Sequence, residues 1–365
     1  MPKQYFPLFP TFVTVMASHH HTSGINPQFK VSGRKQKPSE YFINGLNSGN
    51  RFILSECITL LESTHPEKRK VAEAVLNTIP FQNETTIRIG ITGSPGVGKS
   101  TFIEAFGLYL ISQHHRPAIL AIDPSSQINK GSILGDKTRM QHLSAHPDAY
   151  VRPSPSGAVL GGTSAFTKEA IQVCEAGGFD IIIVETVGVG QSETEVDHIT
   201  DVNILLLQPG AGDDIQGIKR GIVENADIFV INKADGPQLE LAKHTKSAYK
   251  NAIQLFHHDV PEWICPVILT SALDKKGMDE VFQSITGYIN LLKKKELFIS
   301  KRKHQELRWF ERQSLVRLKE IAFENSVIKS TYQQLSHEMS AGKLSATSAI
   351  HHFEEAFRKL INNLK

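Results

Sequence analysis

The chain has 365 residues, of which 40% are hydrophobic and 21% are charged, and its formal net charge at pH 7 is +3. This composition is typical of a globular protein with one large domain or two smaller ones. The near balance of charge argues against nucleic acid or an anionic membrane as the main partner. No apolar run reaches the ~18 residues that a membrane span requires. Three scattered cysteines without a CxxC spacing favour a reducing compartment, so we expect a cytoplasmic protein or, alternatively, one of the mitochondrial matrix.

Residues 1–39 contain no Asp or Glu but do contain Lys3, Lys30, Arg34, Lys35 and Lys37. An organellar presequence has this composition, and so does a disordered basic tail, which we favour. Apolar residues at helical spacing follow in residues 50–63 and 67–79, with a break near Pro66. Residues 40–85 are therefore predicted to form a small helical segment.

The pattern then changes to short aliphatic runs separated by helical stretches. These runs are residues 87–91, 118–122, 180–185, 202–207, 227–232 and 266–270. Strands that are apolar on both faces and alternate with helices indicate a parallel sheet covered on both sides. Residues 86–295 are thus predicted to be a phosphate-loop NTPase domain of the α/β class, with a doubly wound, mostly parallel sheet.

Residues 296–365 are charged and amphipathic, and they predict an α-helical extension. A polar break near Gly342 separates residues 297–325 from a second amphipathic segment, 345–361. The first segment carries an apolar stripe that includes Leu307 and Phe310. The stripe either packs back on its own domain or, as we favour, forms the arm of a homodimer.

The string GITGSPGVGKST, residues 90–101, contains the phosphate-loop pattern GxxxxGK[ST] between a predicted strand and a predicted helix. Glycines let the backbone N–H groups surround phosphate oxygens, and the helix N-terminus adds a favourable dipole. Lys99 is expected to reach the β- and γ-phosphates and Ser100 to bind Mg²⁺. The residues expected to bind nucleotide here are Gly93, Ser94, Pro95, Gly96, Val97, Gly98, Lys99, Ser100 and Thr101.

Glu185 ends the aliphatic run DIIIVE, at the carboxyl end of a strand, where α/β proteins bind ligands. We expect it to face Mg²⁺ through a water molecule. Most phosphate-loop enzymes use Asp here, which is one methylene shorter, so another residue must adjust or bind the metal directly. Asp123 and Asp136 are the candidates, although Asp136 could instead cap a helix.

Gly188 follows Glu185 and is expected to donate its backbone N–H to the γ-phosphate. The glycine-rich segment after it can be ordered by that phosphate and released after hydrolysis. Catalysis is expected to be mostly positioning and charge stabilisation, with Lys99, Glu185 and Lys219 as the catalytic candidates. Lys219 could equally be an ordinary solvated helix residue.

The string INKAD, residues 231–235, ends another predicted core strand and has the pattern NKxD. Asp235 can accept hydrogen bonds from both N1–H and the exocyclic amine of guanine, a donor pair that adenine lacks. The Lys233 stem can lie along the base, and Asn232 can brace the loop or the base. Ser271 and Ala272 are expected to contact guanine O6 through their backbone N–H groups. These motifs together predict a Mg²⁺-dependent GTPase that binds GTP and GDP.

Four longer strings are more specific: GDKTRM, YVRPSPSGAVLGGTSAFTKEAI, IIIVETVGVGQSE and AGDDIQGIKRGI. They resemble the cobalamin-associated GTPases that chaperone acyl-CoA mutases, the family of the methylmalonyl-CoA mutase accessory proteins. The resemblance covers about residues 40–360, and residues 1–39 depart from it. It implies a homodimer through the C-terminal arm and a role in gating adenosylcobalamin loading and protecting the mutase. It also implies nucleotide or Mg²⁺ roles for Lys99, Ser100, Asp123, Asp136, Glu185, Asn232, Lys233 and Asp235.

Two other functions share the phosphate loop. A metallochaperone GTPase would carry Cys and His clusters for its metal, and the sequence offers only paired histidines such as His257 and His258. A kinase would need a base beside the γ-phosphate, and no convincing candidate stands out in the sequence.

Overall fold

The computed structural model describes residues 36–63, 65–80, 84–122, 140–152, 163–186, 196–211, 220–254 and 258–363. The chain divides into two units, Met1–Gln36 and Lys37–Lys365. All the described helices and strands belong to the second unit. The helices that precede the sheet in the chain and those that follow it belong to the same unit as the sheet. The domain boundaries predicted near residues 85 and 296 therefore stay predictions.

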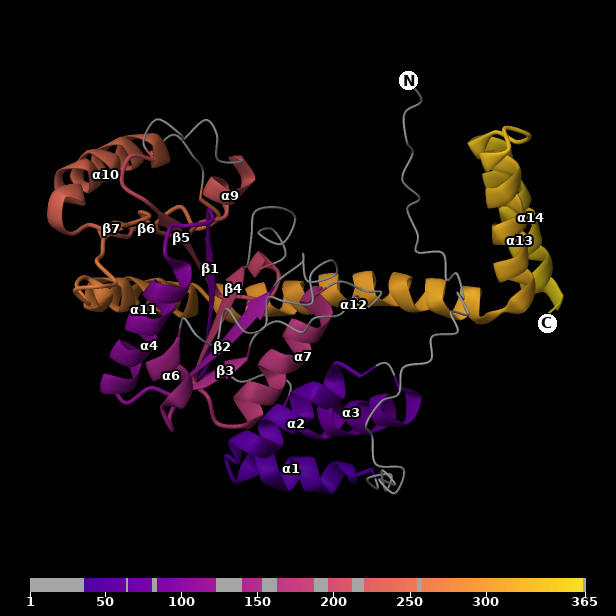
Figure 1. Ribbon diagram of the computed structural model, residues 1–365, viewed down its shortest axis with the longest axis horizontal. Coiled ribbons are helices and arrows are strands. Elements are labelled where there is room, and N and C mark those ends of the chain that lie inside the picture. Colours follow the sequence, from indigo (N-terminus) through magenta and orange to yellow (C-terminus); the bar gives the residue numbers. More distant parts are fainter. Residues whose placement is uncertain are drawn as a thin grey trace, which may run out of the picture. The chain divides into compact units, whose positions relative to one another are not determined.

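A seven-stranded parallel sheet forms the centre of this unit, in the order β3-β2-β4-β1-β5-β6-β7 (Figure 1). The strands are β1 (Ile87–Gly93), β2 (Pro117–Ile122), β3 (Tyr150–Arg152), β4 (Ile181–Thr186), β5 (Val202–Leu207), β6 (Ile228–Ile231) and β7 (Val267–Leu269). The strand order reverses beside β1, since β4 lies on one side of it and β5 on the other. Such a switch point creates a crevice at the carboxyl ends of the strands, where α/β proteins bind ligands.

Both faces of the sheet are covered by helices, which explains why its strands are apolar throughout (Figure 1). One face packs against α4 (Lys99–Ser112), α6 (Gln141–Ala145) and α11 (Met278–Lys294). Along β4, Ile181 and Ile183 belong to that core, whereas Ile182 and Val184 face the opposite one. The opposite face packs against α7 (Thr163–Ala176), α9 (Arg220–Glu224) and α10 (Leu239–Ile253), with a short 3-10 turn η2 (Gly236–Gln238) before α10.

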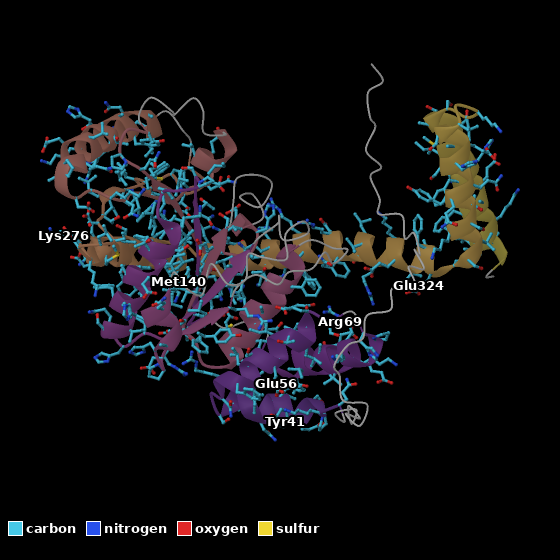
Figure 2. All side chains as sticks on the ribbon, viewed as in Figure 1. Tyr41, Glu56, Arg69, Met140, Lys276 and Glu324 are labelled. Carbon is cyan, nitrogen blue, oxygen red and sulfur yellow. The ribbon has the colours of Figure 1, made fainter. Side chains whose placement is uncertain are left out.

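Three short helices precede the sheet: α1 (Ser39–Asn47), α2 (Arg51–Leu61) and α3 (Pro66–Thr78). The Asn50 side chain caps α2 by accepting hydrogen bonds from the backbone N–H groups of Phe52 and Ile53. Tyr41 and Glu56 link the first two helices, with the Tyr41 hydroxyl 3.3 Å from a Glu56 carboxylate oxygen (Figure 2). The apolar faces of these helices join the core under α7, so they are part of the same folded unit.

Three helices follow α11 at the C-terminal end: α12 (Leu297–Glu324), α13 (Ser326–Ser340) and α14 (Ala346–Asn363). The base of α12 is anchored by a buried ion pair, in which Arg302 donates to both oxygens of Asp201 at 2.8 and 2.6 Å. Gln305 donates to the backbone carbonyls of Asp197 and Thr200, each at 2.8 Å. These contacts fix α12 to the chain segment that leads into β5.

The predicted fold class is confirmed, because each predicted aliphatic run forms a parallel strand at nearly the predicted residues. Some elements were not predicted, among them α13, which lies between the two helical segments predicted at residues 297–325 and 345–361. β3 has only three residues at the edge of the sheet, too few for a periodic pattern, and α1 lies where we expected only the beginning of order. Among the described residues, no helix combines the length and apolar character that a membrane span needs.

Asp227 organises a polar cluster beneath the sheet, and the cluster makes stability depend on pH. Its carboxylate accepts from the Asn203 backbone N–H at 2.7 Å and lies 2.9 Å from His258 Nε2. Burial lowers the pKa of His258, but the hydrogen bonds to Asp227 and Cys265 outweigh burial and raise the pKa to about 10. His258 is therefore charged in the folded protein at neutral pH.

The His258 pair predicts a loss of stability in mild base. The folded pKa lies above the unfolded value of about 6.5, so the stabilisation is fully present below pH 6.5 and is lost as pH rises through 10. Between pH 7 and 10, the free energy of unfolding should fall further in the wild type than in His258→Gln, by about 3 kcal/mol. Urea unfolding at each pH measures this. Equal slopes in the two proteins would contradict the assignment.

Candidate active site

The phosphate loop joins the end of β1 to the start of α4, and its three glycines, Gly93, Gly96 and Gly98, all have a positive φ that disfavours a side chain. A Cβ atom on Gly93 would lie 2.5 Å from the Leu206 carbonyl oxygen. Gly98 has φ +91°, a left-handed conformation that side chains disfavour, and its Cβ would lie 2.9 Å from Asn232 Nδ2. The loop backbone is thus pressed against β5 and the loop after β6.

Lys99 and Ser100 open α4 at the mouth of this loop. The Lys99 ammonium curls back over the loop and donates to the carbonyls of Gly93 at 2.6 Å and Ser94 at 3.3 Å. The Ser100 hydroxyl donates to Glu185 Oε1 at 3.3 Å. A hydroxyl and a carboxylate are oxygen donors of the kind that Mg²⁺ prefers, so this pair fits a magnesium ion.

Glu185 reaches this position because β4 pairs with β1 in parallel, with Glu185 opposite Ile91. The carboxylate is 4% exposed at the end of a strand whose residues are all buried. A buried carboxylate is costly unless it is paired or binds a cation. Its location therefore favours a role at the site over a surface role.

Asn232 connects the phosphate loop to the base-recognition loops. Its side-chain amide donates to the Val97 carbonyl at 3.1 Å and accepts from the Ala272 backbone N–H at 3.3 Å. The Thr270 hydroxyl donates to the same amide oxygen at 3.4 Å, a contact that the sequence did not point to. Asn232 is 1% exposed, so its amide acts as a buried brace.

Lys233 also bridges to the phosphate loop. Its backbone adopts a left-handed conformation with φ +59°, which is uncommon for a residue with a side chain. Its ammonium donates to the Gly96 carbonyl at 2.6 Å. The lysine stem therefore spans the space between the NKxD loop and the phosphate loop, where a base between the two would lie against it.

Asp235 and the loop after β7 lie on the other side of the proposed base site from Lys233. The Ser271 hydroxyl donates to Asp235 Oδ2 at 2.5 Å, which holds the carboxylate in place. The backbone N–H of Ser271 donates to the Lys276 carbonyl, and that of Ala272 to Asn232. Both amides expected to contact guanine O6 thus have protein acceptors in this structure, and their contact with a base stays a prediction.

Four predicted site residues lie outside the described residues: Asp123, Asp136, Gly188 and Lys219. The structure brings together the rest of the predicted set, since Lys99, Ser100 and Glu185 lie at one end and Asn232, Lys233 and Asp235 at the other. A glycine phosphate loop, a buried carboxylate beside its serine, and an NKxD loop braced on that same loop define a phosphate-loop GTPase.

Comparisons with known proteins agree with this class. The family described as "Methylmalonyl Co-A mutase-associated GTPase MeaB" matches residues 54–326. The Escherichia coli (strain K12) protein named GTPase ArgK is 39% identical over 313 residues, which cover 86% of this chain and 95% of that protein. The mouse protein named methylmalonic aciduria type A homolog, mitochondrial, is 42% identical over 299 residues, covering 79% of this chain and 71% of that protein.

A solved structure agrees as well. The crystal structure of LAO/AO transport system kinase superposes with a TM-score of 0.69 at 33% identity, covering 88% of this chain and 97% of that one. The chain therefore belongs to the MeaB family of methylmalonyl-CoA mutase-associated GTPases, and the resemblance noted in the sequence is confirmed.

The NKxD loop predicts which base the protein selects. Asp235→Asn replaces an acceptor with an amide that donates, so the variant should lose affinity for GTP and gain affinity for xanthosine triphosphate, whose base has the opposite donor pattern. An unmatched buried polar group costs about 1–3 kcal/mol, so the preference should change by roughly 10- to 100-fold or more. Competition binding with a fluorescent GTP analogue measures it. An unchanged GTP to xanthosine triphosphate ratio would mean that Asp235 does not recognise the base.

Proposed function

We propose that this protein is a Mg²⁺-dependent GTPase that acts as a chaperone for an adenosylcobalamin-dependent acyl-CoA mutase, gating cofactor loading and protecting the mutase. The observation that carries the proposal is the family match over residues 54–326, which encloses every described residue of the nucleotide site. The name of that family associates its members with methylmalonyl-CoA mutase, so this mutase is the proposed partner.

Mg²⁺ is the proposed metal, held by Ser100 and Glu185 with Asp123 and Asp136 as further ligands. The 3.3 Å approach of the Ser100 hydroxyl to the Glu185 carboxylate supports the first two assignments. When bound, the ion would neutralise charge on the β- and γ-phosphates. Glu185 would orient it from a buried strand end, where the carboxylate has little freedom to move.

The chain's own groups would hold the triphosphate in one geometry. Backbone amides of residues 93–101 would surround the phosphates, and Lys99 would exchange its contacts with the Gly93 and Ser94 carbonyls for the β- and γ-phosphates. Gly188 is proposed to bind the γ-phosphate through its N–H, and Lys219 to stabilise the charge that develops there. Because phosphoryl transfer needs little covalent chemistry from the protein, such positioning accounts for most of the expected rate.

The proposed partner makes a direct test possible. Purified protein mixed with methylmalonyl-CoA mutase should co-elute with it in gel filtration, and the mutase should raise the rate of GTP hydrolysis by about tenfold or more, which corresponds to ~1.4 kcal/mol of barrier. Lys99→Ala should still fold but hydrolyse no GTP with or without the mutase. If the mutase neither co-elutes nor changes the rate, while GTP hydrolysis persists, the chaperone assignment fails and the GTPase assignment stands.

We also propose that the C-terminal helices form a homodimer. One face of α12 is anchored to its own domain, yet the side chains of Leu307, Phe310, Leu318 and Ile321 are 59–65% exposed on another face. Four large apolar residues at helical spacing form the kind of contiguous patch that marks a protein interface. A second copy offers the same stripe, and the self-complementary arrangement suits a two-fold interface.

Charge placed in this stripe should separate the two copies. The double variant Phe310→Asp and Leu318→Asp should sediment as a monomer at micromolar concentration, whereas the wild type sediments as a dimer. Phe52→Asp is a matched control, because Phe52 is 68% exposed on α2 and outside the stripe. GTP hydrolysis should persist in all three proteins. A monomeric wild type, or a dimer that survives both aspartates, would reject the interface.

A further inference from the structure

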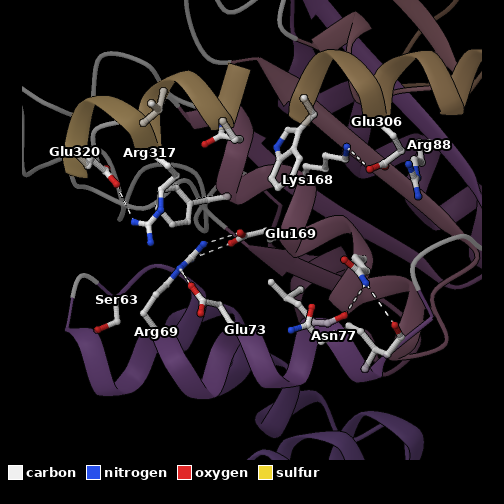
Figure 3. A pocket seen from close by; sticks show the side chains of 17 residues that line it. Ser63, Arg69, Glu73, Asn77, Arg88, Lys168, Glu169, Glu306, Arg317 and Glu320 are labelled. Atoms are coloured by element: carbon white, nitrogen blue, oxygen red, sulfur yellow. Dashed lines mark hydrogen bonds and ion pairs between the residues drawn. The ribbon is translucent and has the colours of Figure 1, made fainter. Parts of the chain in front are cut away.

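One face of α12 is turned toward its own molecule. The Lys168 ammonium on α7 lies 2.8 Å from the Glu306 carboxylate (Figure 3) and 4.6 Å from the centre of the Trp309 ring. Glu306, Trp309 and Glu320 all line the cavity between α3, α7 and α12. The exposed stripe lies about a third of a turn round the helix from this face, and it consists of Leu307, Phe310, Leu318 and Ile321.

The spacing of the stripe is the same from either end, and Ser314 is its midpoint. Leu307 and Ile321 lie seven positions before and after Ser314, and Phe310 and Leu318 lie four positions before and after it. At about 100° per residue, all four fall within about 40° of Ser314 around the helix axis. An antiparallel two-fold pair brings each residue against the position equally far on the other side of the midpoint, so this stripe meets a second copy of itself along its whole length.

A charged residue lies beyond each end of the stripe. Lys303 comes eleven positions before Ser314, and Glu324 comes ten positions after it. Both are exposed, and among the described residues neither forms an ion pair or a side-chain hydrogen bond. Around the helix axis they lie about 20° and 80° to the same side of Ser314.

These two charges distinguish the possible orientations of a pair. In an antiparallel pair centred on Ser314, Lys303 of one copy lies within about 2 Å, measured along the helix axis, of Glu324 of the other. In a parallel pair each charge lies level with its own copy, so that lysine meets lysine and glutamate meets glutamate. Opposite charges attract and the dipoles of antiparallel helices oppose one another, so both effects favour the antiparallel pair.

We propose that the α12 helices of two copies cross antiparallel, with Ser314 of each copy at the two-fold axis and Lys303 of each copy paired with Glu324 of the other. This inference rests on the proposed homodimer and specifies its orientation and register. The apolar residues pack across the pair, Leu307 on Ile321 and Phe310 on Leu318. Serine is small, so the two helix axes can approach to the usual ~8–10 Å at the crossing point.

The crossing also separates the two nucleotide-binding domains. Arg302 and Gln305 fix each α12 to its own domain near the start of the helix. In an antiparallel pair the two Arg302 anchors lie about 36 Å apart along the helix axis, at opposite ends of the paired segment. Each nucleotide site therefore belongs to a domain at its own end of the dimer.

Reversing the two charges tests the orientation. Lys303→Glu and Glu324→Lys each place like charges together at both ends of the pair, and each should weaken the dimer roughly tenfold in sedimentation equilibrium. The double variant restores opposite charges and should return to within about twofold of the wild type. Arg308→Glu is a matched control, because Arg308 is exposed on the same helix about 120° away from Ser314, and it should leave the affinity unchanged.

Single cysteines test the register. Ser314→Cys should give a disulfide-linked dimer on mild oxidation, because residues that face each other at the crossing point come within the ~4.4–6.8 Å between Cα atoms that a disulfide spans. Lys303→Cys should give none, since the antiparallel pair holds its two copies about 33 Å apart, whereas a parallel pair would link them. The wild type, with the same three native cysteines, is the blank.

The outcomes separate this inference from the homodimer itself. A monomeric wild type would reject both. A dimeric wild type that links through Lys303→Cys, fails to link through Ser314→Cys, or shows no rescue in the double charge variant would overturn the antiparallel crossing and leave the homodimer in place. GTP hydrolysis, measured in parallel, should be equal in all the variants and shows that each is folded.

Discussion

The side-chain amide of Asn232 is the interaction on which the nucleotide site depends. It donates to the phosphate loop at Val97 and accepts from the loop after β7 at Ala272, so one buried group sets the distance between the two ends of the site. A backbone carbonyl and a backbone amide are its partners, and neither can rotate away. Gly98 must lack a side chain for the same reason, because a Cβ there would collide with this amide. The positions of the phosphate loop and of the base-recognition loops therefore depend on the packing around this one side chain.

That packing is possible because the sheet is parallel and buried on both faces. Parallel strands end at the same edge of the sheet, so the loops after β1, β6 and β7 lie close to the carboxyl end of β4. The cost is that polar groups at this edge must satisfy one another, and they do: Ser100 pairs with Glu185, Ser271 with Asp235, and Lys233 with the Gly96 carbonyl. The groups proposed to bind the nucleotide thus also hold the loops in place through internal hydrogen bonds.

Sequence reasoning predicted the sheet, but it did not predict the contacts that link the proposed site residues. Strands with two buried faces have a continuous apolar pattern, and this signal was correct for β1, β4 and β5. β3 was not predicted because its three residues are too few for a periodic pattern, and they form a strand only through pairing with β2. The contact between Asn232 and Val97 joins residues 135 positions apart, a pairing that depends on strand order.

Anchoring α12 at its base has a mechanical consequence. The helix has 28 residues, so it extends about 42 Å at 1.5 Å per residue. Arg302 and Gln305 donate hydrogen bonds to Asp201 and to the backbone carbonyls of Asp197 and Thr200. These three residues lie in the chain between Gly188, the proposed γ-phosphate contact, and β5. A rigid helix held near one end acts as a lever. The end of α12 at Glu324 lies ~30 Å beyond Gln305, so a tilt of about 5° at the anchor displaces that end by about 2.5 Å. Motions too small to alter the core would thus be magnified along the rod.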